Sequence, residues 1–281
     1  MKPKATIVIP WRPSPSRLAA YTRVREFWDR YFPRWPVITA DSETEIFSLS
    51  QARNAGVKLA QTDVVIIADA DTLVDPPNIL TAVADPAGVW WPFEHYRIYG
   101  PEHLATPLEN LADTPHLNTW DGHGIAGVGG VIVTTQQEYW RLGGQPPEFY
   151  GWGWEDVAFT LIARTLSQVR RHPGNVYAFE HNPLTSGYLG APADTPGWDR
   201  DITRNQPLLG YYRCGDGRPW LMHELIKQRT TTSPSPSPPP NSTPAAPDSP
   251  HPTTPATPAT SPATSTPQAT PTAAQQHPSQ P

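Results

Sequence analysis

Two clusters of acidic side chains have the spacing of a site that could do chemistry. Asp69 and Asp71 flank a single alanine directly after the apolar run 63–68. In an extended chain, residues two apart point to the same side, so both carboxylates could face one site. Two like charges held close are costly unless a cation lies between or beside them, and Mn²⁺ or Mg²⁺ prefers carboxylate oxygens. The alternative is a pair of solvated loop acids that cap a helix beginning at Pro76.

The second cluster lies in a short stretch, YGWGWED, that packs glycines, aromatic rings and acids together. Glycines allow a tightly bent backbone, and Tyr150, Trp152 and Trp154 could stack on the C–H faces of sugar rings. Glu155 and Asp156 stand in the first turn of a predicted helix, about 100° apart around its axis. One could therefore position a substrate hydroxyl while the other removes its proton. The alternative is that the acids stabilise the helix start and the tryptophans fill a core.

Strands that alternate with helices are expected to position these acids. Short apolar runs predict strands at 5–10, 36–40, 63–68, 88–93, 127–135 and 175–180. Periodicity and capping signals predict helices at 17–32, 50–60, 136–142 and 155–168, and another that begins at Pro76. Ser50 is expected to be the N-cap of the second helix, and residues 94–121 show no clear period. This order predicts an α/β fold with a mainly parallel sheet flanked by helices.

Polar side chains follow several of the predicted strands. Asp41, Asp69, Asp71 and His181 all stand at such ends. Ligands of parallel sheets bind beyond the carboxyl ends of the strands, so we expect these four residues to share one site.

Composition changes abruptly near residue 229. All aromatic residues lie at or before Trp220, whereas the chain after Arg229 holds no Lys or Arg, one acid and 16 of the 37 prolines. Such a segment cannot bury enough apolar surface to offset its ordering entropy. We therefore expect residues 1–229 to form one catalytic domain and residues 230–281 a disordered tail. Within the domain, the aromatic residues of 183–229 predict an acceptor-side lid.

Several classes of protein are disfavoured by composition. No run of about 18 apolar residues predicts a membrane span, and the apolar stretch near the N-terminus is too short for a signal peptide. The single cysteine, Cys214, excludes an internal disulfide and a cysteine-based metal cage. A net charge of −5 with dispersed charges argues against nucleic-acid binding. Together these features predict a cytoplasmic protein; they say nothing of its oligomeric state.

Four motifs, in their order and spacing, resemble a known family. They are GGV at 129–131, YW at 139–140, LGG at 142–144 and GWGWED at 151–156. This block closely resembles the C-terminal half of the β-1,4-galactosyltransferase catalytic domain, which is shared with family-2-like glycosyltransferases of the GT-A fold. PWR at 10–12 resembles the P-F-R of that family, and SQARNAG at 50–56 its A-R-N-x-G helix start. The resemblance covers about residues 6–182.

The resemblance implies metal-dependent, inverting transfer of a galactose-type hexose from a UDP-sugar to a hydroxyl of a glycan, lipid or protein. Asp156 would be the general base, and Glu155 would hydrogen-bond a sugar. Asp71 and His181 would hold Mn²⁺ or Mg²⁺, and Trp152, Trp154 and Tyr150 would form a stacking wall. The residues implied in donor binding are Pro10, Trp11, Arg12, Asp41, Arg53, Asp69, Asp71 and Gly130.

This sequence departs from the family pattern at some positions. Trp154 stands where the family usually has glycine, and Ala178 stands where the galactosyltransferases have a methionine before the metal-binding histidine. Two alternatives remain open. One is a retaining GT-A transferase resembling the polypeptide N-acetylgalactosaminyltransferases, and the other is a non-catalytic sugar-binding module that keeps only the aromatic loop.

Overall fold

The computed structural model describes residues 4–121, 129–151, 153–180 and 198–231. These residues form ten strands, eight helices and short 3-10 turns at Pro15–Arg17 and Pro101–His103. The strands are β1 (Thr6–Pro10), β2 (Val37–Ala40), β3 (Val64–Ala68), β4 (Thr72–Val74), β5 (Val89–Trp91), β6 (His95–Tyr99), β7 (Asn118–Asp121), β8 (Val131–Thr135), β9 (Val169–Arg171) and β10 (Asn175–Phe179). The helices are α1 (Leu18–Tyr31), α2 (Leu49–Lys58), α3 (Pro76–Ala84), α4 (Leu108–Leu111), α5 (Gln136–Arg141), α6 (Glu155–Leu166), α7 (Trp198–Gly215) and α8 (Pro219–Thr231).

The larger sheet has the order β2-β1-β3-β8-β5-β9. The β1–β2, β1–β3 and β5–β9 pairs are parallel, whereas β8 runs antiparallel to both of its neighbours. The strands β1 and β3 are almost wholly buried, as their β-branched, apolar sequences require. The α/β class with a mainly parallel sheet is therefore confirmed.

A second sheet, of order β4-β10-β6-β7, was not expected as a separate layer. Its central pair, β10 with β6, is parallel, and both outer pairs are antiparallel. The strands β4, β6, β7 and β9 escaped prediction. Three-residue strands are too short to show a period, and the extended state of β6 and β7 depends on pairing across long stretches of sequence.

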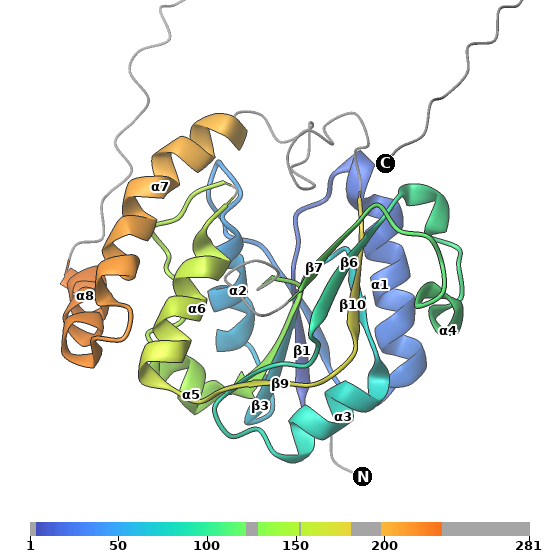
Figure 1. Cartoon of the computed structure of the whole chain (residues 1–281), viewed down its shortest axis with the longest axis horizontal. Coiled ribbons are helices and arrows are strands. Elements are labelled where there is room, and N and C mark those ends of the chain that lie inside the picture. The colour runs from blue at the N-terminus through green and yellow to red at the C-terminus, as the bar shows by residue number, and fades with distance from the viewer. Residues whose placement is uncertain (1–3, 122–128, 152, 181–197, 232–281) are drawn as a thin grey trace, which may run out of the picture. The chain divides into compact units, whose positions relative to one another are not determined.

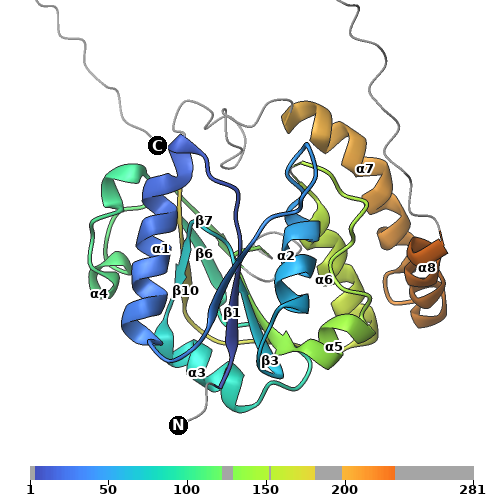
Figure 2. The ribbon, with the colours of Figure 1, turned by 180° about the vertical axis from the view of Figure 1, so that it is seen from behind.

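Helices flank the strands as predicted. Figures 1 and 2 show α1 on one side of the strands and α2 and α6 on the other. The predicted N-cap of α2 was wrong: Ser48 takes that role, since its hydroxyl accepts the Gln51 N–H at 3.4 Å, and Ser50 lies buried inside the helix. The region expected to be a lid holds α7 and α8, which pack against α6 and against each other.

The link between the two sheets carries the first acidic motif. The chain leaves β3 of the larger sheet at Ala68, passes through Asp69-Ala70-Asp71 and enters β4 of the second sheet at Thr72. The acids therefore lie where the two sheets meet. All described residues fall in one compact unit, Met1–Ser235. Within the described part of the chain, no helix is long and apolar enough to cross a membrane.

Candidate active site

Asp69 is held by the backbone of Gly130. The Asp69 N–H donates to the Gly130 carbonyl at 2.7 Å, and Asp69 Oδ2 accepts the Gly130 N–H at 2.9 Å. Gly130 has a φ of +94°, in the left-handed region where any side chain would be strained. The glycine thus fixes the direction of the carboxylate. Because the Asp69 side chain is only 18% exposed, it is not a solvated loop acid.

Arg53 connects Asp69 to the second acidic cluster. It lies on α2 with a side chain that is 2% exposed. Its Nη2 lies 2.5 Å from Asp69 Oδ1, and its Nη1 lies 3.5 Å from Glu155 Oε1 and donates to Gln145 Oε1 at 3.4 Å. Burial alone would lower the pKa of Arg53, but the charges of Asp69 and Glu155 raise it above its ordinary value. Arg53 is therefore a permanent cation between two acids far apart in sequence.

Asp156 and Asp69 face the same glycine. A Cβ added to Gly129 would lie 3.2 Å from Asp156 Oδ2 and 3.6 Å from Asp69 Oδ2. The other carboxylate oxygen of Asp156 accepts the Val157 N–H at 2.7 Å, which leaves Oδ2 directed toward Gly129. The absence of a side chain at Gly129 therefore leaves space between two carboxylates, one directly after β3 and one on α6.

The two acids at the start of α6 have unusual proton affinities. Burial, followed by the charge of Asp156, raises the pKa of Glu155 from its ordinary 4.5 to about 8, against the opposing effect of Arg53. Burial also raises the pKa of Asp156, while Arg53 lowers it. Both acids therefore bind a proton more tightly than exposed carboxyl groups do. Strongly shifted acids in close contact are typical of active sites.

Tyr96 of β6 is a residue that the sequence analysis missed. Its ring borders Gly130, where a Cβ would lie 3.1 Å from Tyr96 Cε2. Burial, followed by the charges of Asp71, Asp69 and Asp156, raises the pKa of Tyr96 well above its ordinary value. The phenol therefore keeps its proton beside the three aspartates. Its run HYRIY, rich in aromatic residues, was the signal that could have identified this strand.

Asp71, directly before β4, lies beside the last residue of β10. Its carbonyl accepts the Phe179 N–H at 2.9 Å, which joins the acidic motif to the strand that precedes His181. His181 itself lies outside the described residues. Within the described ranges, no three His, Cys, Asp or Glu side chains form a group that could hold a metal ion. The carboxylate oxygens of Asp69 and Asp71 are nonetheless donors that suit Mn²⁺ or Mg²⁺, so the donor chemistry fits a divalent ion whose remaining ligands come from elsewhere.

The aromatic loop has the bent backbone that its glycines predict. Gly151 and Gly153 have φ values of +64° and +104°. The Tyr150 ring lies under the Arg204 guanidinium, 4.7 Å from its centre. Trp152, one of the predicted stacking residues, lies outside the described residues.

Trp154 adopts a conformation that the family's usual glycine would adopt without cost. Its φ is +74°. For a bulky residue, a left-handed backbone conformation of this kind has a conformational free energy on the order of 1–3 kcal/mol above the common conformations. Its ring is partly buried and packs against the hydrophobic core. Its indole Nε1 is buried without a hydrogen-bond partner among the described residues. Trp154 is therefore a strained residue directly before Glu155, and only part of its ring is exposed.

The residues at the ends of β1 and β2 form a separate group at the same edge of the sheet. Trp11, directly after Pro10, is buried and stacks on Tyr21 with ring centres 4.4 Å apart. Arg12 forms two hydrogen bonds through Nε to Asp41, at 2.9 and 3.1 Å, and a third through Nη2 at 2.7 Å. These bonds hold the pKa of Asp41 below its ordinary value. The predicted donor residues Arg12 and Asp41 are thus brought together as an ion pair.

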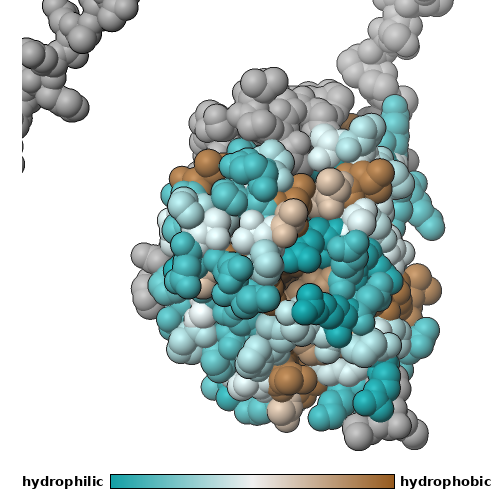
Figure 3. Space-filling model, turned by 90° about the vertical axis from the view of Figure 1, so that its right-hand side faces the viewer, coloured by the Kyte–Doolittle hydropathy of each residue, from teal (hydrophilic) through white to brown (hydrophobic). Residues whose placement is uncertain are grey.

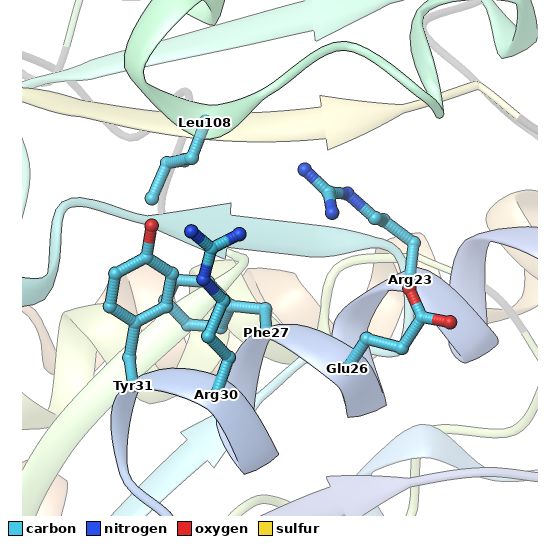
Figure 4. A pocket seen from close by; sticks show the side chains of 6 residues that line it. All are labelled: Arg23, Glu26, Phe27, Arg30, Tyr31 and Leu108. Carbon is cyan, nitrogen blue, oxygen red and sulfur yellow. The ribbon is translucent and has the colours of Figure 1, made fainter.

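A pocket of about 120 Å³ lies elsewhere, between α1 and α4. Figure 4 shows its lining residues, Arg23, Glu26, Phe27, Arg30, Tyr31 and Leu108. Figure 3 shows the side of the molecule that lies to the right in Figure 1, where α1 and α4 are found. This side is mostly hydrophilic, with small, separate apolar patches. None of the lining residues belongs to the acidic site, so the pocket is separate from it.

Comparison with known proteins identifies one segment of the chain. Residues 117–182 match a family model described as the N-terminal domain of galactosyltransferase. We call residues 117–182 the galactosyltransferase-type segment. It contains Gly129, Gly130 and both acids of α6, and it confirms the resemblance to glycosyltransferases that was drawn from the motifs. Arg53, Asp69 and Asp71 precede the galactosyltransferase-type segment and meet it only in the folded chain.

Two solved structures with limited similarity to this chain are glycosyltransferases. A mutant of Drosophila β-1,4-galactosyltransferase 7, in complex with manganese, UDP-Gal and xylobiose, is 18% identical, with 67% of this chain and 75% of that chain covered and a TM-score of 0.45. TarS from S. aureus, in complex with UDP-GlcNAc, is 14% identical, with 82% and 72% covered and a TM-score of 0.44. No curated protein sequence matches the chain.

Proposed function

We propose that the chain is a metal-dependent, inverting glycosyltransferase that moves a galactose-type hexose from a UDP-sugar to an acceptor hydroxyl. The observation that supports it most is the arrangement of Asp69 and Asp156 around the bare backbone of Gly129, with buried Arg53 and Glu155 behind them. A pure sugar-binding module has no need of buried acids with raised pKa values. Gly129, Glu155 and Asp156 of this arrangement lie in the galactosyltransferase-type segment.

Asp156 is the proposed general base. Its Oδ2 points to the space beside Gly129 and lies close enough to Arg53 to be influenced by its charge. Oδ2 takes the proton of the acceptor hydroxyl while that oxygen forms a bond to the anomeric carbon. The bond from this carbon to the diphosphate breaks on the opposite face, and UDP leaves with the electron pair, so the configuration inverts.

Glu155 and Arg53 are assigned to orientation. With a pKa of about 8, Glu155 is protonated at neutral pH and can donate a hydrogen bond to a sugar hydroxyl. Arg53 directs the carboxylate of Asp69, which would contact the ribose or sugar of the donor. A divalent ion held by Asp71 and His181 would neutralise charge on the leaving diphosphate. Arg12 and Asp41 would line the uridine end, and the aromatic residues of the loop, Tyr150, Trp152 and Trp154, would contact the sugar.

The direct test is titration calorimetry of UDP with and without Mn²⁺. We expect binding that requires the ion and that Asp71→Ala abolishes. Unchanged, metal-dependent binding by Asp71→Ala would remove Asp71 from the site. NMR of the first sugar released from UDP-galactose then decides stereochemistry, because inversion of the α-linked donor gives β-galactose and retention gives the α anomer.

A further inference from the structure

Asn205, on α7, binds the backbone of the aromatic loop at two points. Its side chain is completely buried. Its Nδ2 donates to the Tyr150 carbonyl at 2.9 Å and to the Gly153 carbonyl at 3.1 Å, and its Oδ1 accepts the Tyr150 N–H at 3.4 Å. Figure 1 shows α7 alongside α6, the helix that carries the two acids. One buried amide therefore spans the loop that leads into α6.

The bond to Gly153 acts on the strained residue that follows. The Gly153 carbonyl and the Trp154 N–H belong to the same planar peptide group. Fixing this plane restrains rotation about the N–Cα bond of Trp154, whose dihedral angle φ is +74°. Strained backbone of this kind persists only where its surroundings hold it. Glu155 and Asp156 follow directly, so their placement depends on the orientation of that peptide group.

The other side of the loop is anchored independently. Ser48, the N-cap of α2, donates its hydroxyl to the Phe149 carbonyl at 2.8 Å and forms a β-bridge with Gly151. This contact ties the loop to the helix that carries Arg53. It does not reach Gly153 or Trp154. Among the described contacts of the loop, the hydrogen bond from Asn205 is the one that holds the peptide before Trp154.

We propose that Asn205 is a positioning residue for sugar transfer. It fixes the Gly153–Trp154 peptide so that Glu155 and Asp156 start α6 in the orientation that faces Gly129 and Arg53. The proposal rests on the function proposed above for this site. It makes α7, which lies outside the galactosyltransferase-type segment, a part of the catalytic apparatus.

Asn205→Asp is the informative variant, because it keeps the shape of the side chain and loses both donated hydrogen bonds. With UDP-galactose and Mn²⁺, and water as acceptor, we expect kcat to fall by about 10- to 100-fold, since misplacement by about 1 Å can cost that much. KM for UDP-galactose should change by less than about twofold, because the residues proposed to hold the UDP part of the donor are untouched. An unchanged kcat would overturn the proposal.

Asn78→Asp is the matched control. Asn78 is also buried, and its Nδ2 also donates to two backbone carbonyls, those of Pro92 at 3.0 Å and Pro173 at 2.9 Å. The same chemical change there lowers stability without touching the aromatic loop. Hydrogen exchange should therefore accelerate at the amides of 154–156 in Asn205→Asp and not in Asn78→Asp. Equal exchange at these amides in the two variants would contradict a positioning role.

A double substitution tests the route through Trp154. Glycine adopts a left-handed φ without strain, so a Trp154→Gly protein depends less on Asn205. The loss of kcat caused by Asn205→Asp should be several-fold smaller in that background, and an equal loss would refute this route. If wild-type protein neither hydrolyses UDP-galactose nor binds UDP with Mn²⁺, the proposed function fails, while the exchange comparison still decides the role of Asn205.

Discussion

The Arg53 guanidinium lies 2.5 Å from the carboxylate of Asp69 and is almost completely buried. This pair joins α2 to the end of β3, and the further contact with Glu155 extends it to α6. The buried arginine and its two acids come from three parts of the fold, so their contacts define the relative positions of α2, the end of β3 and α6. Breaking such a pair leaves a buried charge without a partner, which is much more costly than losing an ion pair at the surface.

Arg53→Met should destabilise the protein strongly. Removal of the cation leaves the buried carboxylate of Asp69 without its charged partner, and the expected loss is about 3–5 kcal/mol. Chemical denaturation monitored by tryptophan fluorescence measures it. The exposed pair Arg25–Asp29 offers the control, since Arg25→Met should cost less than about 1 kcal/mol. A similar loss in both variants would show that the buried network does not stabilise the fold.

Asp156→Asn should separate donor binding from turnover. The amide keeps the size of the side chain but cannot accept the acceptor proton, and a general base contributes about 10²–10⁴-fold. We expect turnover of UDP-galactose to fall by that factor, while calorimetry gives a Kd for UDP close to that of the wild type. Near-normal turnover would remove Asp156 from the role of base.

Gly129→Ala should block the site without changing the fold. The added methyl group would lie 3.2 Å from Asp156 Oδ2 and 3.6 Å from Asp69 Oδ2, in the space assigned to the reacting groups. We expect turnover of UDP-galactose to drop by at least about 100-fold, as for other misplacements of reacting groups. Gly210→Ala is the control, because a Cβ at Gly210 meets no atom within 4 Å. Full activity of Gly129→Ala would place the reaction elsewhere.

Glu155 should set the alkaline limb of the pH profile. Asp156 acts when ionised, so kcat/KM rises as pH passes its raised pKa, whereas Glu155 acts when protonated, so kcat/KM falls above its pKa of about 8. The glutamine side chain of the Glu155→Gln variant does not ionise in this pH range. The variant should keep the acid limb and lose the alkaline one in steady-state assays between pH 5 and 10. An unchanged alkaline limb would assign it to another group.

The same group should make stability depend on pH. The pKa of Glu155 is higher in the folded chain than in the unfolded chain, so the folded state binds this proton more tightly. Its contribution to stability is complete below the ordinary pKa of 4.5 and is lost as pH rises through about 8. The Tm of the wild type should therefore fall relative to Glu155→Gln over this interval. A constant difference in Tm would contradict the pKa shift.

The sequence alone determined the local elements and the kind of chemistry. Apolar runs and capping residues are local signals, so the strands around Ile66 and Val133 and the helix that begins at Glu155 could be predicted from their own residues. The spacing of the motifs was sufficient to show the resemblance to galactosyltransferases. The second sheet was missed because the extended state of β4, β6 and β7 is stabilised by partners distant in sequence.

Only the tertiary structure decided how the chemical groups meet. No local pattern could show that Arg53 is buried against Asp69 and Glu155, that Tyr96 borders Gly130, or that Asn205 holds the loop before Trp154. These contacts join residues that are tens of positions apart, and their energies depend on burial, which a sequence does not specify. Proton affinities follow the same rule: the raised pKa of Glu155 arises on folding, because desolvation and the neighbouring charge of Asp156 exist only in the folded chain.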